Sequence, residues 1–381
     1  MIFYRLWQVM IDLDQSKYLN ISCLNQPHSD IQNAGVYNPI FICVISHTET
    51  SNIPGITVAG ANTDLIKYTS AADSEYLYYG YCKSMNKIPV TPDGKPTPAV
   101  ISRTALQLAD IPLFVVDGGS FIKPSIPLIS FGLKPGKNII YGDAVDISEV
   151  RKAYDYGIIL GRQLAKTNDL IVIGESIPGG TTTALGVLTA LGIDAKFKVS
   201  SSMPKNPHDL KNRIIAECMQ KININFDSIK SDPFTAISYF GDPMIPTVAG
   251  ICDGGVTSGG RVMLAGGTQM SAVIAVLKAL RRPLDNVFIG TTSYVADDLS
   301  ANLLELMNSI SPEVPVYVID LHMNESEYAG LQAFAKGFIK EGVGAGGLAI
   351  TASLKSRGRI NGSVLLKAIE RQYELTIKMS D

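Results

Sequence analysis

Two segments of the chain carry glycine and threonine where an apolar run passes into a helical pattern. The first is LIVIGESIPGGTTTALGVL, residues 170–188, and the second is VMLAGGTQMSAVIAV, residues 262–276. Glycine lets the backbone approach a ligand closely, and the free N–H groups of a first helical turn attract an anion. Thr181, Thr182 and Thr183 add hydroxyl donors to the first segment. These residue types at this spacing favour binding of a phosphate or a carboxylate.

Two common nucleotide-binding motifs do not fit the first segment. A nucleoside-triphosphate P-loop needs Lys before Ser or Thr, but Gly180 occupies that position. The GxGxxG dinucleotide fingerprint is absent as well. An ordinary strand-to-helix turn with Thr181 as its cap stays open as the alternative. Chance repetition of Gly-Gly-Thr at 266–268, in a chain with 34 glycines, also stays open.

A third segment, FIKEGVGAGGLAI at 338–350, places the single acid Glu341 before a run of glycines. A carboxylate between apolar segments suits general base catalysis, because partial desolvation raises its pKa toward neutrality. The alternative is a helix C-terminus with a solvated Glu and a glycine stop. Glu175 is a second acid at a strand end, with a role at the helix dipole as its alternative. Asp253 and Asp320 are interpreted as turn or cap residues.

Six apolar runs predict the strands that position these segments. They do not alternate with polar residues, which is typical of a parallel sheet covered on both faces. The predicted strands are 41–46, 112–117, 170–174, 261–267, 286–291 and 314–320. Predicted helices follow most of them, at 181–191, 268–280, 297–309 and 326–340. We therefore predict a doubly wound α/β domain with ligands bound at the carboxyl ends of the strands, at the switch point.

The composition limits the classes of partner and site. The chain has 381 residues, of which 46% are hydrophobic, with 33 basic and 35 acidic residues and no basic stripe. Nucleic acid and anionic membranes are therefore not expected as partners. The five cysteines form no CxxC pair, and the four histidines lack metal-ligand spacing, so we predict no disulfide framework and no metal site. Without a membrane-length apolar run or a signal peptide, the protein is expected in the cytoplasm.

Four motifs together resemble the nicotinate-nucleotide–dimethylbenzimidazole phosphoribosyltransferase family of cobalamin biosynthesis, most closely its archaeal branch. They are GES-IPGGTTTALG, GDP at 241–243, VMLAGGTQMSAV and KEGVGAGG, in this order. Segments 53–77 and 91–119 resemble the same branch. The likeness covers most of the chain, from about residue 40 to about residue 355.

This resemblance implies a Rossmann-like parallel-sheet domain, here residues 41–355. It also implies a smaller helical domain built from both chain ends, residues 1–40 and 356–381, and a homodimer. Members of the family transfer the phosphoribosyl group of nicotinate mononucleotide to a benzimidazole-like base without a cofactor. They release nicotinate and form the α-ribazole phosphate of the cobamide lower ligand.

The resemblance also implies roles for individual residues. Glu341 matches the catalytic Glu of a Glu-Gly-x-Gly motif, with Gly342 and Gly344, and Glu175 matches a second pocket Glu. The implied nucleotide and phosphate contacts are Gly179, Gly180, Thr181, Thr182, Gly266, Gly267 and Thr268, and more loosely Lys211 or Arg213 and Thr292 or Ser293.

The chain departs from the bacterial pattern at two turns. Bacterial members have Asn-Thr-Thr where this chain has Gly180-Thr181-Thr182, and Asp-Gly where it has Gly266-Gly267. The departures leave the acceptor base and the nucleotide open. The alternatives are a phosphoribosyltransferase with another acceptor, such as a purine or a phenol, and a non-catalytic nucleotide-binding protein.

Overall fold

The fold is built around one eight-stranded sheet. The computed structural model describes residues 21–26, 31, 35–60, 63–85, 95–222 and 226–378. The strand order is β1-β8-β7-β6-β5-β2-β3-β4; β1 runs antiparallel to β8, and every other neighbouring pair is parallel. The strands are β1 (Ile21–Cys23), β2 (Pro39–Ile45), β3 (Leu113–Asp117), β4 (Ile129–Ser130), β5 (Leu170–Ser176), β6 (Val262–Ala265), β7 (Val287–Thr292) and β8 (Val316–Ile319). The predicted mostly parallel sheet is confirmed.

Both faces of the sheet are buried, which explains why its strands are apolar without alternation. Successive side chains of a strand point to opposite faces. On β2, Ile40, Ile42 and Val44 belong to one hydrophobic core, and the residues between them belong to the other. Each face therefore needs its own layer of helices.

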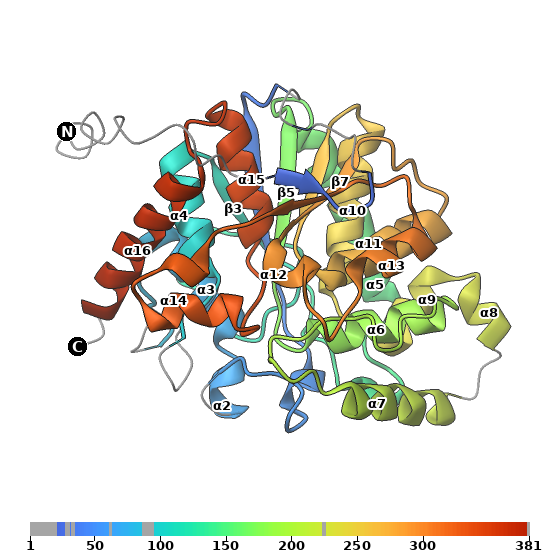
Figure 1. Ribbon diagram of the computed structural model, residues 1–381. Helices are drawn as coiled ribbons and strands as arrows, with labels where there is room; N and C mark the ends of the chain where they lie inside the picture. Colours follow the sequence, from blue (N-terminus) through green and yellow to red (C-terminus); the bar gives the residue numbers. More distant parts are fainter. Residues whose placement is uncertain are drawn as a thin grey trace.

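Helices supply both layers (Figure 1). One core includes residues of α5 (Ile147–Leu164), α6 (Gly180–Ala190), α7 (His208–Lys221), α8 (Phe226–Lys230), α9 (Pro233–Phe240), α10 (Met244–Thr257), α11 (Thr268–Ala279), α12 (Ser293–Ala296) and α13 (Leu303–Ile310). The other includes residues of α3 (Thr69–Tyr79), α4 (Ala99–Ala109), α14 (Ala329–Ala335), α15 (Ala345–Lys355) and α16 (Gly362–Lys378). This three-layer arrangement is the predicted doubly wound α/β fold.

Two predicted helices are shorter than the sequence pattern suggested. The helix expected at 297–309 begins at Leu303, because the side chain of Asn302 accepts the N–H of Glu305 over 2.9 Å and caps it there. The helix expected at 326–340 is α14, which ends at Ala335. Gly337 follows with φ +84°, a left-handed conformation that a helix cannot continue through.

The two ends of the described chain occupy different parts of the fold. β1 extends the sheet beside β8, and α16 packs against α4. Most of the expected N-terminal element lies outside the described residues, so the division into a large and a small domain stays a prediction. None of the helices in the described part of the chain is long and apolar enough to cross a membrane.

The direction of the winding changes between β2 and β5. From β2 the chain moves outward through β3 and β4, and from β5 it moves to the other side through β6, β7 and β8. Glu175 and Ser176 end β5 at this switch point, opposite Val44 and Ile45 of β2. In open parallel sheets, ligands bind at the carboxyl ends of the strands at such a point.

Candidate active site

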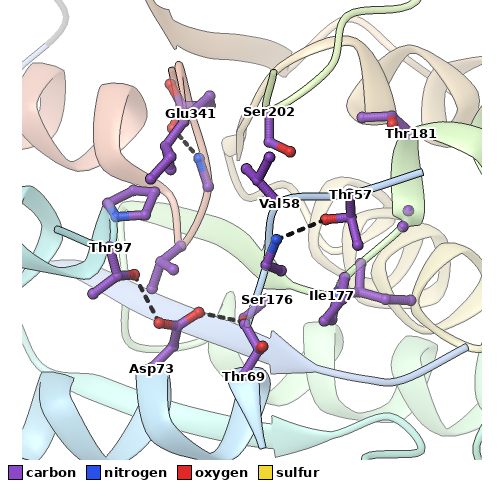
Figure 2. A pocket seen from close by; sticks show the side chains of 18 of the residues that line it. Thr57, Val58, Thr69, Asp73, Thr97, Ser176, Ile177, Thr181, Ser202 and Glu341 are labelled. Atoms are coloured by element: carbon purple, nitrogen blue, oxygen red, sulfur yellow. Dashed lines mark hydrogen bonds between the residues drawn. The ribbon is translucent and has the colours of Figure 1, made fainter. Parts of the chain in front are cut away.

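A cavity of about 360 Å³ opens at the switch point, and the three segments selected from the sequence meet there (Figure 2). The predicted site residues that line it are Glu175, Gly179, Gly180, Thr181, Gly267, Thr268, Glu341 and Gly342. Residues 56–60, residues 200–202 and the segment of α3 that carries Asp73 are among the other parts of the wall. The cavity therefore joins parts that are far apart in the sequence.

A close crossing of two backbones places Glu341 over the end of β5. A Cβ atom on Gly174 would lie 2.8 Å from the Cα of Gly344, so the crossing has no room for a side chain. The N–H of Val343 donates to the carbonyl of Glu175 over 2.9 Å and holds the two segments together. Glycine at 174 and 344 is thus required by the approach of the loop to the strand.

The carboxylate of Glu341 stands at the beginning of a helix. Its Oε1 accepts the N–H of Gly346, in the first turn of α15, over 3.1 Å, and its Oε2 accepts the N–H of Thr292 over 3.1 Å and the hydroxyl of Thr291 over 3.4 Å. Burial raises the pKa of Glu341 to about 7, although these donors act to lower it. Glu341 does not end a helix, as the alternative required, because α14 ends at Ala335 and α15 begins at Ala345.

The carboxyl group of Glu175 is held by two donors. Its Oε2 accepts the N–H of Ile177 over 2.9 Å, and its Oε1 accepts the side-chain N–H of Gln269 over 3.1 Å. Burial raises the pKa of Glu175 to about 8, and the nearby charges of Asp242 and Glu341 add to this effect. The charge of Glu341 thus adds to the burial that keeps Glu175 protonated at neutral pH.

Two buried aspartates stand beside these acids, and sequence reasoning assigned a role to neither. Asp73 accepts the hydroxyls of Thr97 and Ser176, each over 2.7 Å, and burial raises its pKa to about 6. Asp242 accepts the hydroxyl of Thr183 and caps the start of α10, and burial raises its pKa to about 6 as well. The GDP motif contained Asp242, whereas no pattern indicated Asp73.

The beginnings of two helices also line the cavity. Gly179, with φ +78°, turns the chain from β5 into α6, whose first residues are Gly180 and Thr181. Gly267 and Thr268 begin α11 at the same cavity. The N–H groups of a first helical turn lack partners within the helix, and the helix dipole is positive there. The starts of α6 and α11 therefore suit an anionic group.

Several predicted contact residues lie behind the cavity wall. Thr292 is buried and donates its hydroxyl to the carbonyl of Lys340 over 2.7 Å, so it supports Glu341 from behind. Ser293 begins α12 and donates to Asp320 over 3.4 Å. Thr182 is buried in α6. These three residues do not line the cavity, and neither do Gly266 and Gly344.

The two predicted phosphate-binding cations differ sharply in position. Lys211 is fully buried on α7, and its Nζ donates to the carbonyl of Ser200 over 2.7 Å. It therefore contacts the wall of the cavity from behind. Arg213 lies on the exposed side of α7, 3.9 Å from Glu217. The structure does not bring Arg213 to the cavity.

Comparisons with known proteins agree with this architecture. A family model described as phosphoribosyltransferase matches residues 98–307, more than half of the chain. A UPF0284 protein of Archaeoglobus fulgidus is 48% identical over 334 residues, which is 88% of this chain and 93% of that protein. A UPF0284 protein of Methanothermobacter thermautotrophicus is 43% identical over 320 residues, 83% of this chain and 88% of that protein.

Solved structures show the same fold at low sequence identity. The nicotinate-nucleotide-dimethylbenzimidazole phosphoribosyltransferase of Thermus thermophilus superposes with a TM-score of 0.60 at 15% identity, covering 86% of this chain and 83% of that one. The relatives and the family model confirm the family that the sequence motifs indicated. The chain belongs to the phosphoribosyltransferase family, together with the archaeal UPF0284 proteins.

Proposed function

We propose that this protein transfers the phosphoribosyl group of nicotinate mononucleotide to a benzimidazole-like base and forms an α-ribazole phosphate for the cobamide lower ligand. One observation carries the proposal: Glu341 and Glu175 face a single cavity together with the glycine–threonine turn at the start of α6. The carboxylate of Glu341 can accept a proton, and the start of α6 suits a phosphate.

In the proposed reaction, the bond between the ribose and the pyridinium nitrogen breaks, and its electron pair leaves with nicotinate. A nitrogen of the incoming base forms the new bond to the same carbon from the opposite face, which gives the α-linked product. Glu341 accepts the N–H proton of that base, and the incoming N–H takes the place of its longest hydrogen bond, the 3.4 Å contact from Thr291. General base help of this kind contributes about 10²–10⁴ in rate.

Glu175 complements Glu341 in this scheme. A pKa of about 8 keeps Glu175 protonated at neutral pH, whereas a pKa of about 7 leaves Glu341 substantially ionised. Different environments thus give two carboxyl groups different roles, with Glu341 as the base. The first residues of α6 and α11 hold the phosphate, so positioning and electrostatics supply the rest of the catalysis.

The proposed function is tested by incubating the full chain with nicotinate mononucleotide and a panel of acceptors. The panel contains benzimidazoles, adenine and phenols, and free nicotinate and the new glycoside are measured by chromatography coupled to mass spectrometry. Release of nicotinate with a benzimidazole supports the proposal. Release only with a purine or a phenol assigns another acceptor, and binding of the nucleotide without release under every acceptor assigns a non-catalytic nucleotide-binding protein.

A further inference from the structure

Asp73 is an acidic group at the cavity that the proposed reaction does not use. Helix α3 lines the cavity with Thr69, Ala72 and Asp73, whose spacing places them on one side of the helix. The side chain of Asp73 is buried, and it lines the same cavity as Glu175 and Glu341. Its charge helps to raise the pKa of Glu175, so the carboxyl group of Asp73 acts on the proposed site.

The carboxylate of Asp73 is paired only with hydroxyl groups. Its Oδ1 accepts the hydroxyl of Thr97 and its Oδ2 accepts the hydroxyl of Ser176, each over 2.7 Å. Among the described residues, no basic side chain lies within ion-pair distance of Asp73. An ionised carboxylate can accept about four hydrogen bonds, so roughly half of this capacity is unused. Asp73 can therefore accept a further hydrogen bond from a ligand in the cavity.

The apolar part of the cavity wall suits a flat aromatic ring. This part includes the side chains of Ile56, Val58, Leu65, Ile177, Val295 and Val343. A ring that carries only methyl groups would exclude water from Asp73 and offer it no donor, which is costly for a buried carboxylate. A ring with an N–H or O–H group at that place would replace the excluded water. The carboxylate thus distinguishes between rings of similar size.

The position of Asp73 favours contact with the acceptor base over contact with the nucleotide phosphate. In the view of Figure 2, Asp73 and Thr181 lie at opposite corners of the site, whereas Glu341 is drawn on the same side as Asp73. Thr181 belongs to the start of α6, where the phosphate is proposed to bind. A phosphate at that place is held away from Asp73, and the proposed base Glu341 is on the side of Asp73.

We propose that Asp73 determines the specificity for the acceptor base by accepting a hydrogen bond from an N–H or O–H substituent on its six-membered ring. The site then takes amino- or hydroxy-substituted benzimidazoles in preference to methyl-substituted ones. This inference rests on the proposed function, because the cavity has to hold an aromatic acceptor. Asp73 contacts a substituent of the acceptor in this account and takes no part in the proton transfer to Glu341.

Three benzimidazoles of similar size test the preference without any glycosyl chemistry. They carry an amino, a hydroxyl or a methyl group at the same carbon of the six-membered ring. Their binding to the full chain is measured by titration calorimetry, alone and with ribose 5-phosphate, which has no nicotinate to release. We expect the amino and hydroxy compounds to bind about 10- to 100-fold more tightly than the methyl compound, as for a hydrogen bond to a charged group.

A pair of variants assigns this preference to Asp73. Asp73→Asn removes the charge at constant size and is expected to reduce the preference by about tenfold, because neutral hydrogen bonds are weaker than charged ones. Asp242→Asn is the matched control: Asp242 is also buried, with its pKa raised to about 6, but it does not line the cavity. Its neutralisation should leave the preference unchanged. If Asp73→Asn does not unfold cooperatively, Asp73→Ser replaces it.

The outcomes distinguish this inference from the proposed function. It is overturned if the unaltered chain binds none of the three bases, or binds the methyl compound as tightly as the other two. It is also overturned if a folded Asp73 variant keeps the preference; weaker binding of ribose 5-phosphate in that variant would assign Asp73 to the ribose instead. A preference that depends on Asp73, in a chain that releases no nicotinate with any acceptor, supports the role of Asp73 and rejects the proposed transfer.

Discussion

The side-chain N–H of Gln269 donates to Glu175 over 3.1 Å and thereby links the start of α11 to the end of β5. The other end of the same amide lies against Gly180, where a Cβ atom would be 2.1 Å from Gln269 Oε1. Glycine at position 180 therefore makes room for the side chain that orients Glu175.

Gly180→Ala should force Gln269 away from Glu175. We expect a loss of about 1–3 kcal/mol in the free energy of unfolding, as for other overpacked sites. In the double variant with Gln269→Ala the clash is absent, so its loss should be smaller than the sum of the two single losses. Chemical denaturation of the four proteins measures the difference. Strictly additive losses would show that the two residues do not interact.

Glu341→Gln removes the proposed base while keeping its size. We expect nicotinate release to fall about 10²–10⁴-fold with little change in nucleotide affinity, because only proton transfer is lost. Glu49→Gln is the matched control: Glu49 is exposed in the 3-10 helix Glu49–Asn52, and its neutralisation should change neither quantity. Unchanged turnover in Glu341→Gln would refute the assignment of the base.

The rate of transfer should depend on pH through both acids. Glu341 must be ionised to accept a proton, so kcat/KM should rise as the pH passes through about 7. Above about 8, Glu175 loses its proton and places a second negative charge in the cavity, so the rate should fall again. A pH profile of nicotinate release tests this, and Glu175→Gln should remove the alkaline limb. A profile in that variant identical to the original would contradict the role given to Glu175.

Burial of Glu175 should also make stability depend on pH. Its pKa is raised from 4.5 to about 8 in the folded chain. Between these values the folded state binds more protons than the unfolded state, so the free energy of unfolding falls as the pH rises. Glu175→Gln cannot ionise, so we expect it to be more stable than the original above pH 8, on the order of 5 kcal/mol, and to lose this advantage toward pH 4.5. Denaturant titrations of both proteins near pH 4.5 and above pH 8 check this prediction. The same dependence of stability on pH in the two proteins would reject it.

Asp73 should stabilise the floor of the cavity through its two hydroxyl partners. Asp73→Asn keeps one acceptor oxygen and so leaves the hydroxyl proton of either Thr97 or Ser176 without an acceptor. We expect a loss of about 1–3 kcal/mol in the free energy of unfolding, the usual cost of an unpaired buried polar group. Asp64→Asn on the exposed side of α2 (Thr63–Ile66) is the control. Equal melting temperatures for both variants would contradict the prediction.

Local sequence pattern was enough for the six inner strands of the sheet and for the turns at its carboxyl edge, but not for the short edge strands β1 and β4. The central strands are continuous apolar runs because both faces are buried, and this shows in any short window of sequence. Helix ends were harder to place: Asn302 caps α13 several residues later than the apolar pattern suggested. A cap depends on one side chain and its own backbone geometry, which periodicity does not record.

The walls of the cavity could not be predicted from local sequence, because they are formed by contacts between distant parts of the chain. Helix α3, which carries Asp73, is buried around most of its surface, so it has no polar stripe for a pattern to reveal. Gln269 was passed over although it follows a selected turn, because its importance comes from Glu175, which is 94 residues away. Both misses have the same cause, since the relevant partner is not a neighbour in sequence.

The sequence by itself determined the family, the parallel sheet and the candidate base, because glycine turns and apolar strands are specified by residues close together in the chain. Only the tertiary structure decided that Lys211 contacts the carbonyl of Ser200 at the cavity wall and that Arg213 faces away. Two residues on one helix differ in this way because each is positioned by what packs against its side of the helix. Burial also set the pKa values of Glu175 and Glu341, since desolvation depends on the surrounding atoms and not on the adjacent residues.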